Sequence, residues 1–332
     1  MVLTFDDFRI DYIGLGQEKC GTSTIAHWLK AHPEIILHPS KELNYFSKNN
    51  QPIFDTTDEY LEKGIQGYID RFNDVYLDFN KKIGEFSTQY LDDTGHYALH
   101  RINKYFPNTK LIICLREPVS RLFSAYKFHV FKKQWLSPMS FEEYIMEVKK
   151  ELNRGFYSDG VGKVLELFPP ENVKVLFLED MKENPDLVAK ELFSFLGVDD
   201  TFCVPSAKTA YNPSMEKRKI DKVFDYAPKA FYVMRHRFKM GRLLDFMRDK
   251  GGGELFFRVR HWIGHKKRSF SMNPLTRELL KNYYSADVKR LSSFLGRDLC
   301  ELWGYQNYVN LPVKNDLDIE LKKIIHDQSE NY

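Results

Sequence analysis

Short apolar runs, each about as long as one β-strand, recur through the first 180 residues of the chain. Lys110–Leu115 is the clearest, because it is continuously apolar after its first residue, as in strands that a parallel sheet buries on both faces. Four further runs of similar length are also expected to be strands: Tyr12–Leu15, Glu34–His38, Ile83–Ser87 and Val173–Leu178.

Longer stretches with helical character lie between these strands. The first helix is expected to end near Pro33, since a residue before proline is pushed out of helical geometry. A last helix, from Thr276 to about Leu295, is expected to stop at Gly296. Further helices are expected near 55–75 and 89–106, from Pro118, and before Phe168. Strands alternating with helices predict an α/β fold of three layers around a central parallel sheet.

Two polar segments follow strands of this predicted sheet. Gly16–Thr24 follows the first strand, and Arg116–Ser124 follows the apolar run Lys110–Leu115. In parallel α/β sheets, ligands bind beyond the carboxyl ends of the strands. Both segments are therefore candidates for one ligand site.

The first segment resembles a phosphate-binding P-loop with its lysine displaced. Gly16 and Gly21 have P-loop spacing, but Thr22 follows the second glycine and Lys19 lies inside the loop. Backbone N–H groups at the start of the next helix favour an anion, and the hydroxyls of residues 22–24 add donors. The ammonium is moved to another part of the ligand, which suggests a phosphate-bearing donor other than simple Mg-ATP.

The second segment predicts another anion site. Arg116 leaves the core strand, and Ser120, Arg121 and Ser124 lie in the first turns of the following helix. Arginine suits bidentate phosphate binding, and the hydroxyls complete the shell. Two anion sites on neighbouring strand ends fit a nucleotide with phosphate groups at both ends. A P-loop kinase using Mg-ATP stays open, because Glu179–Asp180 could supply the magnesium carboxylate.

Composition narrows the class of protein. The 332 residues are 43% hydrophobic and 29% charged with a net charge of +3, which is typical of a globular protein and not of one that coats nucleic acid. No apolar run approaches the roughly 18 residues of a membrane span, and the N-terminus lacks a signal-peptide pattern. We expect a cytoplasmic protein. The four cysteines form no CxxC pair, so zinc and a disulfide framework are not expected, and packing is the favoured role of Cys20.

The segment from about 215 to 268 is strongly basic. It holds sixteen Lys/Arg against six Asp/Glu, so the rest of the chain is acidic by seven. This segment is either the solvated face of surface helices or a basic surface for an anionic donor, an acidic acceptor or a lipid headgroup. The second reading keeps open a different class, a non-catalytic, nucleotide-dependent protein that binds an anionic surface peripherally.

With these motifs in view, residues 10–305 resemble the sulfotransferases that use 3′-phosphoadenosine 5′-phosphosulfate (PAPS), closest to the bacterial and heparan-sulfate-type branch. The loop around Lys19 resembles their 5′-phosphosulfate loop, and Leu115–Tyr126 resembles their 3′-phosphate motif. Lys41–Phe46 resembles the segment of the catalytic carboxylate, and Gly84–Leu91 a substrate-side motif. The resemblance implies these cofactor-binding residues: Lys19, Cys20, Gly21, Thr22, Ser23, Thr24, Arg116, Ser124, Lys266 and Arg268.

The resemblance also implies a mechanism and a domain plan. Sulfuryl transfer would be in line and need no metal, with Lys19 neutralising the bridging oxygen and Glu42 as general base. His129 and His38 are competing bases. The acceptor would be a hydroxyl or amine of a carbohydrate or other small molecule. Residues 1–312 would form one domain with a basic helical insertion at about 215–268, followed by a polar tail, 313–332.

Three residues depart from the family pattern. Phe86 stands where heparan-type enzymes often have Lys, and Thr88 where they have Pro. The missing charge at position 86 argues against the inference that this chain shares their polysaccharide substrate. Lys266–Arg268 resembles a basic loop of the family that closes over the cofactor. Lys267 stands in it where Gly is expected, so the backbone there is expected to follow another path.

Overall fold

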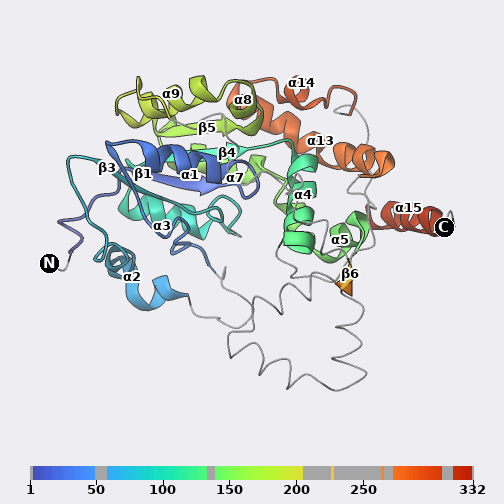
Figure 1. Cartoon of the computed structure of the whole chain (residues 1–332), viewed down its shortest axis with the longest axis horizontal. Helices are drawn as coiled ribbons and strands as arrows, with labels where there is room; N and C mark the ends of the chain where they lie inside the picture. Colours follow the sequence, from blue (N-terminus) through green and yellow to red (C-terminus); the bar gives the residue numbers. More distant parts are fainter. Residues whose placement is uncertain are drawn as a thin grey trace, which may run out of the picture. The chain divides into compact units, whose positions relative to one another are not determined.

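Five parallel strands form the centre of the fold in this computed structural model, which describes residues 3–48, 58–93, 95–132, 139–204, 226–227, 263–264, 272–308 and 317–330. Their order in the sheet is β2-β3-β1-β4-β5. Figure 1 labels β1, β3, β4 and β5 of this sheet. In β1, Tyr12 lies opposite Gly84 of β3 and Lys110 of β4. The strands are β1 (Tyr12–Gly16), β2 (Ile35–Leu37), β3 (Lys82–Phe86), β4 (Lys110–Leu115) and β5 (Val173–Phe177), and all five were predicted from the apolar runs.

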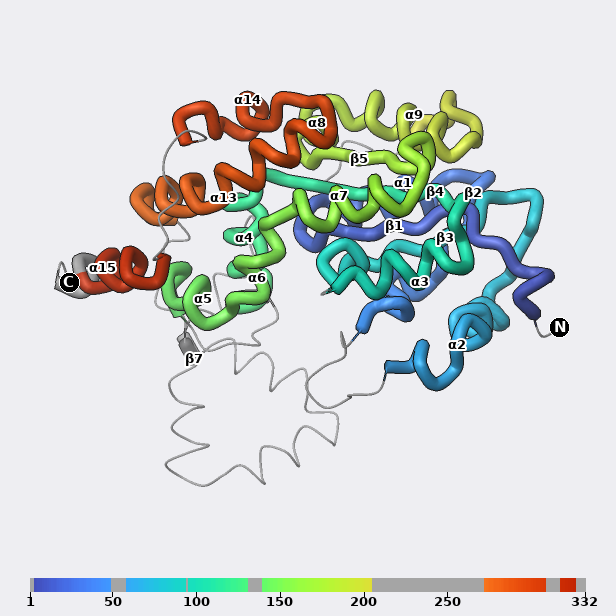
Figure 2. The backbone as a smooth tube through the Cα atoms, turned by 180° about the vertical axis from the view of Figure 1, so that it is seen from behind, coloured from blue at the N-terminus to red at the C-terminus, as the bar shows by residue number. Residues whose placement is uncertain are grey.

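Both faces of the sheet are buried under helices, which confirms the three-layer prediction. Ile112 and Cys114 of β4 pack in one apolar cluster with residues of α1 (Thr22–Ala31) and α9 (Pro185–Leu196). Leu111 and its alternate neighbours pack in the other cluster, with residues of α3, α7 and α13. Figure 2 shows α3 and α7 on the side of the sheet opposite α1. These three helices span Tyr97–Tyr105, Ser158–Leu167 and Pro274–Leu295.

Two glycines let large rings pack across neighbouring strands. A Cβ atom on Gly14 would lie 2.2 Å from the ring of Phe86, and one on Gly84 would lie 2.4 Å from the ring of Tyr12. The rings of Phe86 and Tyr12 therefore occupy the space of the missing side chains. This packing fixes the end of β3, beside which the loop after β1 begins.

The helix predicted over 89–106 is shorter than expected and spans Tyr97–Tyr105. Gly95 and His96 have φ angles of 79° and 54°, in the left-handed region, so the chain cannot be helical through them. The Asp93 carboxylate then accepts a hydrogen bond from the Ala98 N–H at 2.8 Å. The remaining helices among the described residues are α2 (Glu59–Asp70), α4 (Pro118–Lys127), η1 (Phe128–Lys132), α5 (Phe141–Glu147), α6 (Lys149–Asn153), η2 (Pro170–Asn172), α8 (Leu178–Glu183), α14 (Leu299–Trp303) and α15 (Leu317–Glu330).

The description of 313–332 as a polar tail is wrong for the residues that the structure describes. Leu317–Glu330 is helix α15, and its Leu317, Leu321 and Ile324 are buried in the larger apolar cluster. These apolar residues follow helical spacing and face α5 and α13. The helix is therefore part of the folded domain.

The chain divides into two compact units, residues 1–212 with 272–332, and residues 213–271. The second unit overlaps the basic segment 215–268. Its described residues form a two-stranded antiparallel ladder, β6 (Tyr226–Ala227) with β7 (Ile263–Gly264), and the predicted helices there lie outside the described residues. Among the described residues, no helix is both long enough and apolar enough to cross a membrane.

Candidate active site at the carboxyl ends of the strands

The loop after β1 turns sharply into helix α1. Gly16, Lys19 and Gly21 have φ angles of 122°, 69° and 93°, and Gly21 is the N-cap of α1 with no side-chain cap bond. The first N–H groups of a helix have no partner within the helix, so an uncapped start leaves donors for an anion. Lys19 lies inside this turn, and its ammonium nitrogen is 3.8 Å from the centroid of the Phe128 ring.

The two predicted anion sites lie beside each other. Strands β1 and β4 are neighbours, and the Arg116 guanidinium at the end of β4 donates to the Lys19 carbonyl at 3.4 Å. The Tyr157 hydroxyl holds the Arg116 carbonyl at 2.9 Å. Ser124 is buried on the same helix that Arg116 introduces. The geometry brings together the two ends of the site that the sequence predicts for a doubly phosphorylated nucleotide.

Arg121, which lies in the same predicted anion segment as Arg116 and Ser124, does not face the site. Its side chain is fully buried and donates to a Glu151 carboxylate oxygen at 3.0 Å. Arg121 follows Arg116 by five residues on the first turns of α4, which turns it into the core instead of toward the loop. The N–H of Ser120 is likewise engaged, by the Glu117 carboxylate at 2.7 Å.

Glu42 lies next to the loop between β1 and α1. The Lys41 ammonium is 3.3 Å from the Thr22 hydroxyl at the start of α1 and 3.2 Å from one Glu42 carboxylate oxygen. The other Glu42 oxygen accepts from the Thr88 hydroxyl at 3.1 Å. The Glu42 side chain is 39% exposed, so an acceptor can reach it.

The competing histidines have structural surroundings. His38 is buried, with Nδ1 accepting from the Ser40 N–H at 3.1 Å and Nε2 2.9 Å from the Arg71 carbonyl. His129 is also buried, its Nδ1 is 2.8 Å from the Tyr144 hydroxyl, and burial lowers its pKa. A base must reach the acceptor proton, and of the three candidates Glu42 is the exposed one.

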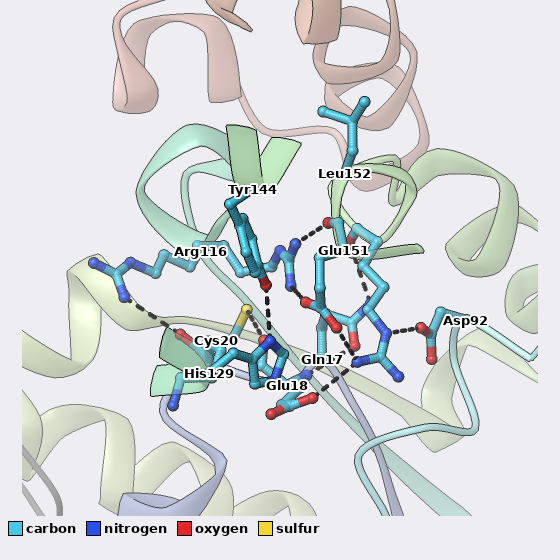
Figure 3. A network of polar contacts seen from close by, with 12 residues as sticks. Gln17, Glu18, Cys20, Asp92, Arg116, His129, Tyr144, Glu151 and Leu152 are labelled. Atoms are coloured by element: carbon cyan, nitrogen blue, oxygen red, sulfur yellow. Dashed lines mark hydrogen bonds and ion pairs between the residues drawn. The ribbon is translucent and has the colours of Figure 1, made fainter. Parts of the chain in front are cut away.

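A buried network of ion pairs and hydrogen bonds contacts the loop after β1 (Figure 3). Arg154 donates to Glu18 of the loop at 2.9 Å and to Glu151 at 2.7 Å, and it also pairs with Asp92. Its carbonyl accepts from the Gln17 side-chain amide at 3.2 Å. Although burial opposes ionisation, the guanidinium groups of Arg154 and Arg121 lower the pKa of Glu151 to about 2. The loop is therefore held by charge-paired groups.

One group of described residues has the spacing of a metal site. Single ligand atoms of Glu18, His129 and Glu151 lie within 4.8 Å of one another. Both carboxylates already pair with arginines, so a cation there would compete with fixed positive charge. The residues fit a salt-bridge network better than a metal ion.

The carboxylates left open for a kinase are also engaged. The Asp180 carboxylate accepts from the Arg297 guanidinium at 2.8 Å, and Glu179 accepts from the Glu117 N–H at 3.2 Å. Cys20 packs fully buried, and burial raises the pKa of its thiol to about 12, which fits the packing role. Lys266 and Arg268, predicted to close over the cofactor, lie outside the described residues.

Comparison with known proteins identifies the family. The family model described as "Sulfotransferase domain" matches residues 9–237. The chain belongs to the sulfotransferase family. This confirms the resemblance found in the sequence motifs.

Individual sulfotransferases cover different shares of the chain. The crystal structure of a sulfotransferase from Alicyclobacillus acidocaldarius is 25% identical, covers 90% of this chain and 99% of that one, and superposes with a TM-score of 0.61. The membrane-associated sulfotransferase kil1 of Dictyostelium discoideum is 33% identical over 145 residues, 41% of this chain and 27% of that protein. Human bifunctional heparan sulfate N-deacetylase/N-sulfotransferase 3 is 26% identical over 207 residues, 56% of this chain and 22% of that protein. The chain thus spans about a quarter of these two relatives.

Several residues of this sulfotransferase site were not predicted from the sequence. Gln17, Arg154 and Glu151 brace the loop, and Lys41 was noted only as the neighbour of Glu42. Arg154 lies 136 residues from Glu18, so no local spacing links the two. Glu151 and Arg154 lie in the strongly charged stretch Glu147–Arg154, which is typical of a solvated surface, so no local signal marked them as buried.

Proposed function

We propose that the protein transfers a sulfuryl group from PAPS to a hydroxyl or amine of a carbohydrate or other small-molecule acceptor. The observation that carries this proposal is the contact between two strand-end sites, where Arg116 reaches the backbone of Lys19 in a member of the sulfotransferase family. One site suits a 5′-phosphosulfate and the other a 3′-phosphate.

In this mechanism each residue acts on a stated atom. Glu42 takes the acceptor proton, the freed electron pair forms the new bond to sulfur, and the bond from sulfur to the bridging oxygen breaks. Adenosine 3′,5′-bisphosphate (PAP) leaves with the electron pair of the broken bond between sulfur and the bridging oxygen. Lys19 neutralises the charge that grows on the bridging oxygen, which is an interaction stronger in the transition state than in the ground state.

A carbohydrate acceptor is supported by the names of the relatives. One is a heparan sulfate N-sulfotransferase, and human carbohydrate sulfotransferase 15 is 21% identical over 62% of this chain. Phe86 removes a charge that heparan-type enzymes often carry, which favours an acceptor less acidic than heparan sulfate.

Three further properties stay predictions. These are a cytoplasmic location, independence of metal ions, and peripheral binding of an anionic surface through 215–268. The arginine pairing of Glu18, Glu151 and Asp180 supports metal independence.

Calorimetric titration with PAP tests the donor class. We expect one site, with the same affinity in EDTA and in Mg²⁺, and an affinity loss of roughly 10- to 100-fold in Arg116→Ala, because hydrogen bonds between charged groups are among the stronger ones. Arg71→Ala, which removes an exposed partner of Glu59, is the matched control and should bind PAP normally. Binding of Mg-ATP in place of PAP would instead identify a kinase. Binding of PAP without transfer to any acceptor, or to water, would identify a non-catalytic protein.

A further inference from the structure

The segment that carries Lys41 and Glu42 is fixed to the end of strand β3. The Lys41 carbonyl accepts from the Phe86 N–H at 3.1 Å, and the Asn44 N–H donates to the Ser87 hydroxyl at 2.8 Å. Thr88, two residues beyond Phe86, donates to Glu42. These bonds bracket Lys41 and Glu42 from both sides, so the positions of their side chains follow from the strand end.

The Lys41 ammonium lies between the donor loop and the candidate base. It is within hydrogen-bond distance of Thr22 and of Glu42, at 3.3 and 3.2 Å, and 5.8 Å from the centroid of the Phe86 ring. The side chain is 21% exposed, which leaves it accessible to a ligand. An ammonium has three donors, so contact with Thr22 and Glu42 leaves one for a further acceptor.

Phe86 leaves the end of β3 without a positive charge. The Phe86 ring packs over Gly14 of the neighbouring strand β1. The ammonium of Lys41 reaches the same place from the loop after β2. The positive charge between the loop after β1 and Glu42 therefore comes from Lys41, in the loop after β2, and not from position 86 on β3.

We infer that Lys41 is a second catalytic cation, which binds the non-bridging oxygens of the sulfuryl group while it moves from PAPS to the acceptor. This inference rests on the proposed function. The group must pass from the loop that ends at Thr22 to an acceptor beside Glu42, and Lys41 contacts Thr22 and Glu42, one at each end of that path. A fixed cation there stabilises the charge on the sulfuryl oxygens, and removing one such donor typically costs about 10²- to 10³-fold in rate.

The test measures transfer and product binding in parallel. With a glucosamine oligosaccharide as acceptor, or water if it is not a substrate, Lys41→Met is expected to lower kcat by about 10²-fold. The affinity for PAP, which has no sulfuryl group, is expected to stay within about threefold of wild type, since phosphate binding is left to other residues. Lys104→Met, an exposed lysine over the Tyr105 ring on α3, is the matched control and should leave both quantities unchanged.

A double variant separates contact with the sulfuryl group from a role exerted only through Glu42. If Lys41 acts on the sulfuryl oxygens, Lys41→Met lowers the residual rate again in a Glu42→Gln background. If it only orients Glu42, the double variant is as active as Glu42→Gln alone, and the inference is overturned. Normal activity of Lys41→Met also overturns the inference about Lys41. In that case, transfer by the wild-type protein in the same assay still supports the proposed function. A wild type that neither binds PAP nor transfers would instead remove the proposed function.

Discussion

Glu85 is a carboxyl group buried inside the sheet, two residues before the hydroxyl that holds the Glu42 segment. Its Oε2 accepts from the Ser87 hydroxyl at 2.7 Å, and Ser87 in turn accepts from the Asn44 N–H. Burial raises the pKa of Glu85 to about 8, although the Ser87 bond opposes this. At neutral pH the side chain is mainly protonated in the folded protein. A neutral residue, not an ion, therefore supports the segment that carries the candidate base.

Glu85→Gln is expected to flatten the dependence of stability on pH. The carboxyl ionises near pH 4.5 when unfolded and near pH 8 when folded, so the folded state holds more protons between these values. Its contribution to stability is complete below about pH 4.5 and is lost as pH rises through 8, by about 5 kcal/mol in total. Glutamine keeps the neutral form and the acceptor for Ser87. Urea unfolding at pH 5, 6.5 and 8 should show a smaller decline for the variant, and parallel curves for the two proteins would contradict a protonated Glu85.

At the level of elements, α6 and the strand ends are joined through Arg154. This residue is the C-cap of α6 and pairs with Glu18 after β1, Glu151 within α6 and Asp92 after β3. A buried charge with partners on three segments fixes their positions, because losing any partner leaves unpaired charge in the core. The loop that carries Lys19 and the segment after β3 are thereby held to one helix.

Arg154→Met is expected to destabilise the protein by roughly 3–5 kcal/mol, because Glu18, Glu151 and Asp92 lose a common cation. The matched control is Lys63→Met, which breaks an exposed i,i+4 pair with Glu59 and should cost less than about 1 kcal/mol. The midpoint of urea unfolding measures both. Equal, small effects of the two substitutions would show that the network does not brace the loop.

Helix α15 makes a second prediction about an element. Leu321 is fully buried, whereas Ile319 on the same helix is 48% exposed. Leu321→Ala is expected to cost about 2–4 kcal/mol by leaving a cavity, and Ile319→Ala less than about 0.5 kcal/mol. Thermal unfolding of the two variants compares them directly. Identical melting temperatures would mean that α15 does not pack on the domain in solution.

On the scale of the whole molecule, the polar segments of the site follow the carboxyl ends of the parallel strands. Parallel strands end on the same side, so Gln17–Gly21, Lys41–Glu42 and Arg116 meet although they are far apart in sequence. The order β2-β3-β1-β4-β5 puts β3 and β4 on either side of β1, with the loop between them. The 3′-phosphate of the sulfuryl donor is thus expected on the β4 side of Lys19, near Arg116, and the acceptor on the β3 side, near Glu42.

This arrangement explains what the sequence could predict. All five strands and the loop were visible because continuous apolar runs and the Gly16–Gly21 spacing are local signals. The orientation of Arg121, the brace through Arg154 and the reach of Lys41 depend on contacts over long separations, which periodicity does not encode. Helix α15 was missed because its few apolar positions lie among charged residues, so packing rather than average hydropathy defines it.

Transfer of labelled sulfate from PAPS in the presence of EDTA tests the central claim most directly. The wild-type protein should release PAP and label an acceptor, or water, without added metal. Lys19→Ala should lower the rate by about 10²-fold or more, since it removes the charge proposed to face the bridging oxygen. Arg116→Ala should do the same by loss of the proposed 3′-phosphate contact. Wild-type rates in both variants would contradict the sulfotransferase assignment of this site.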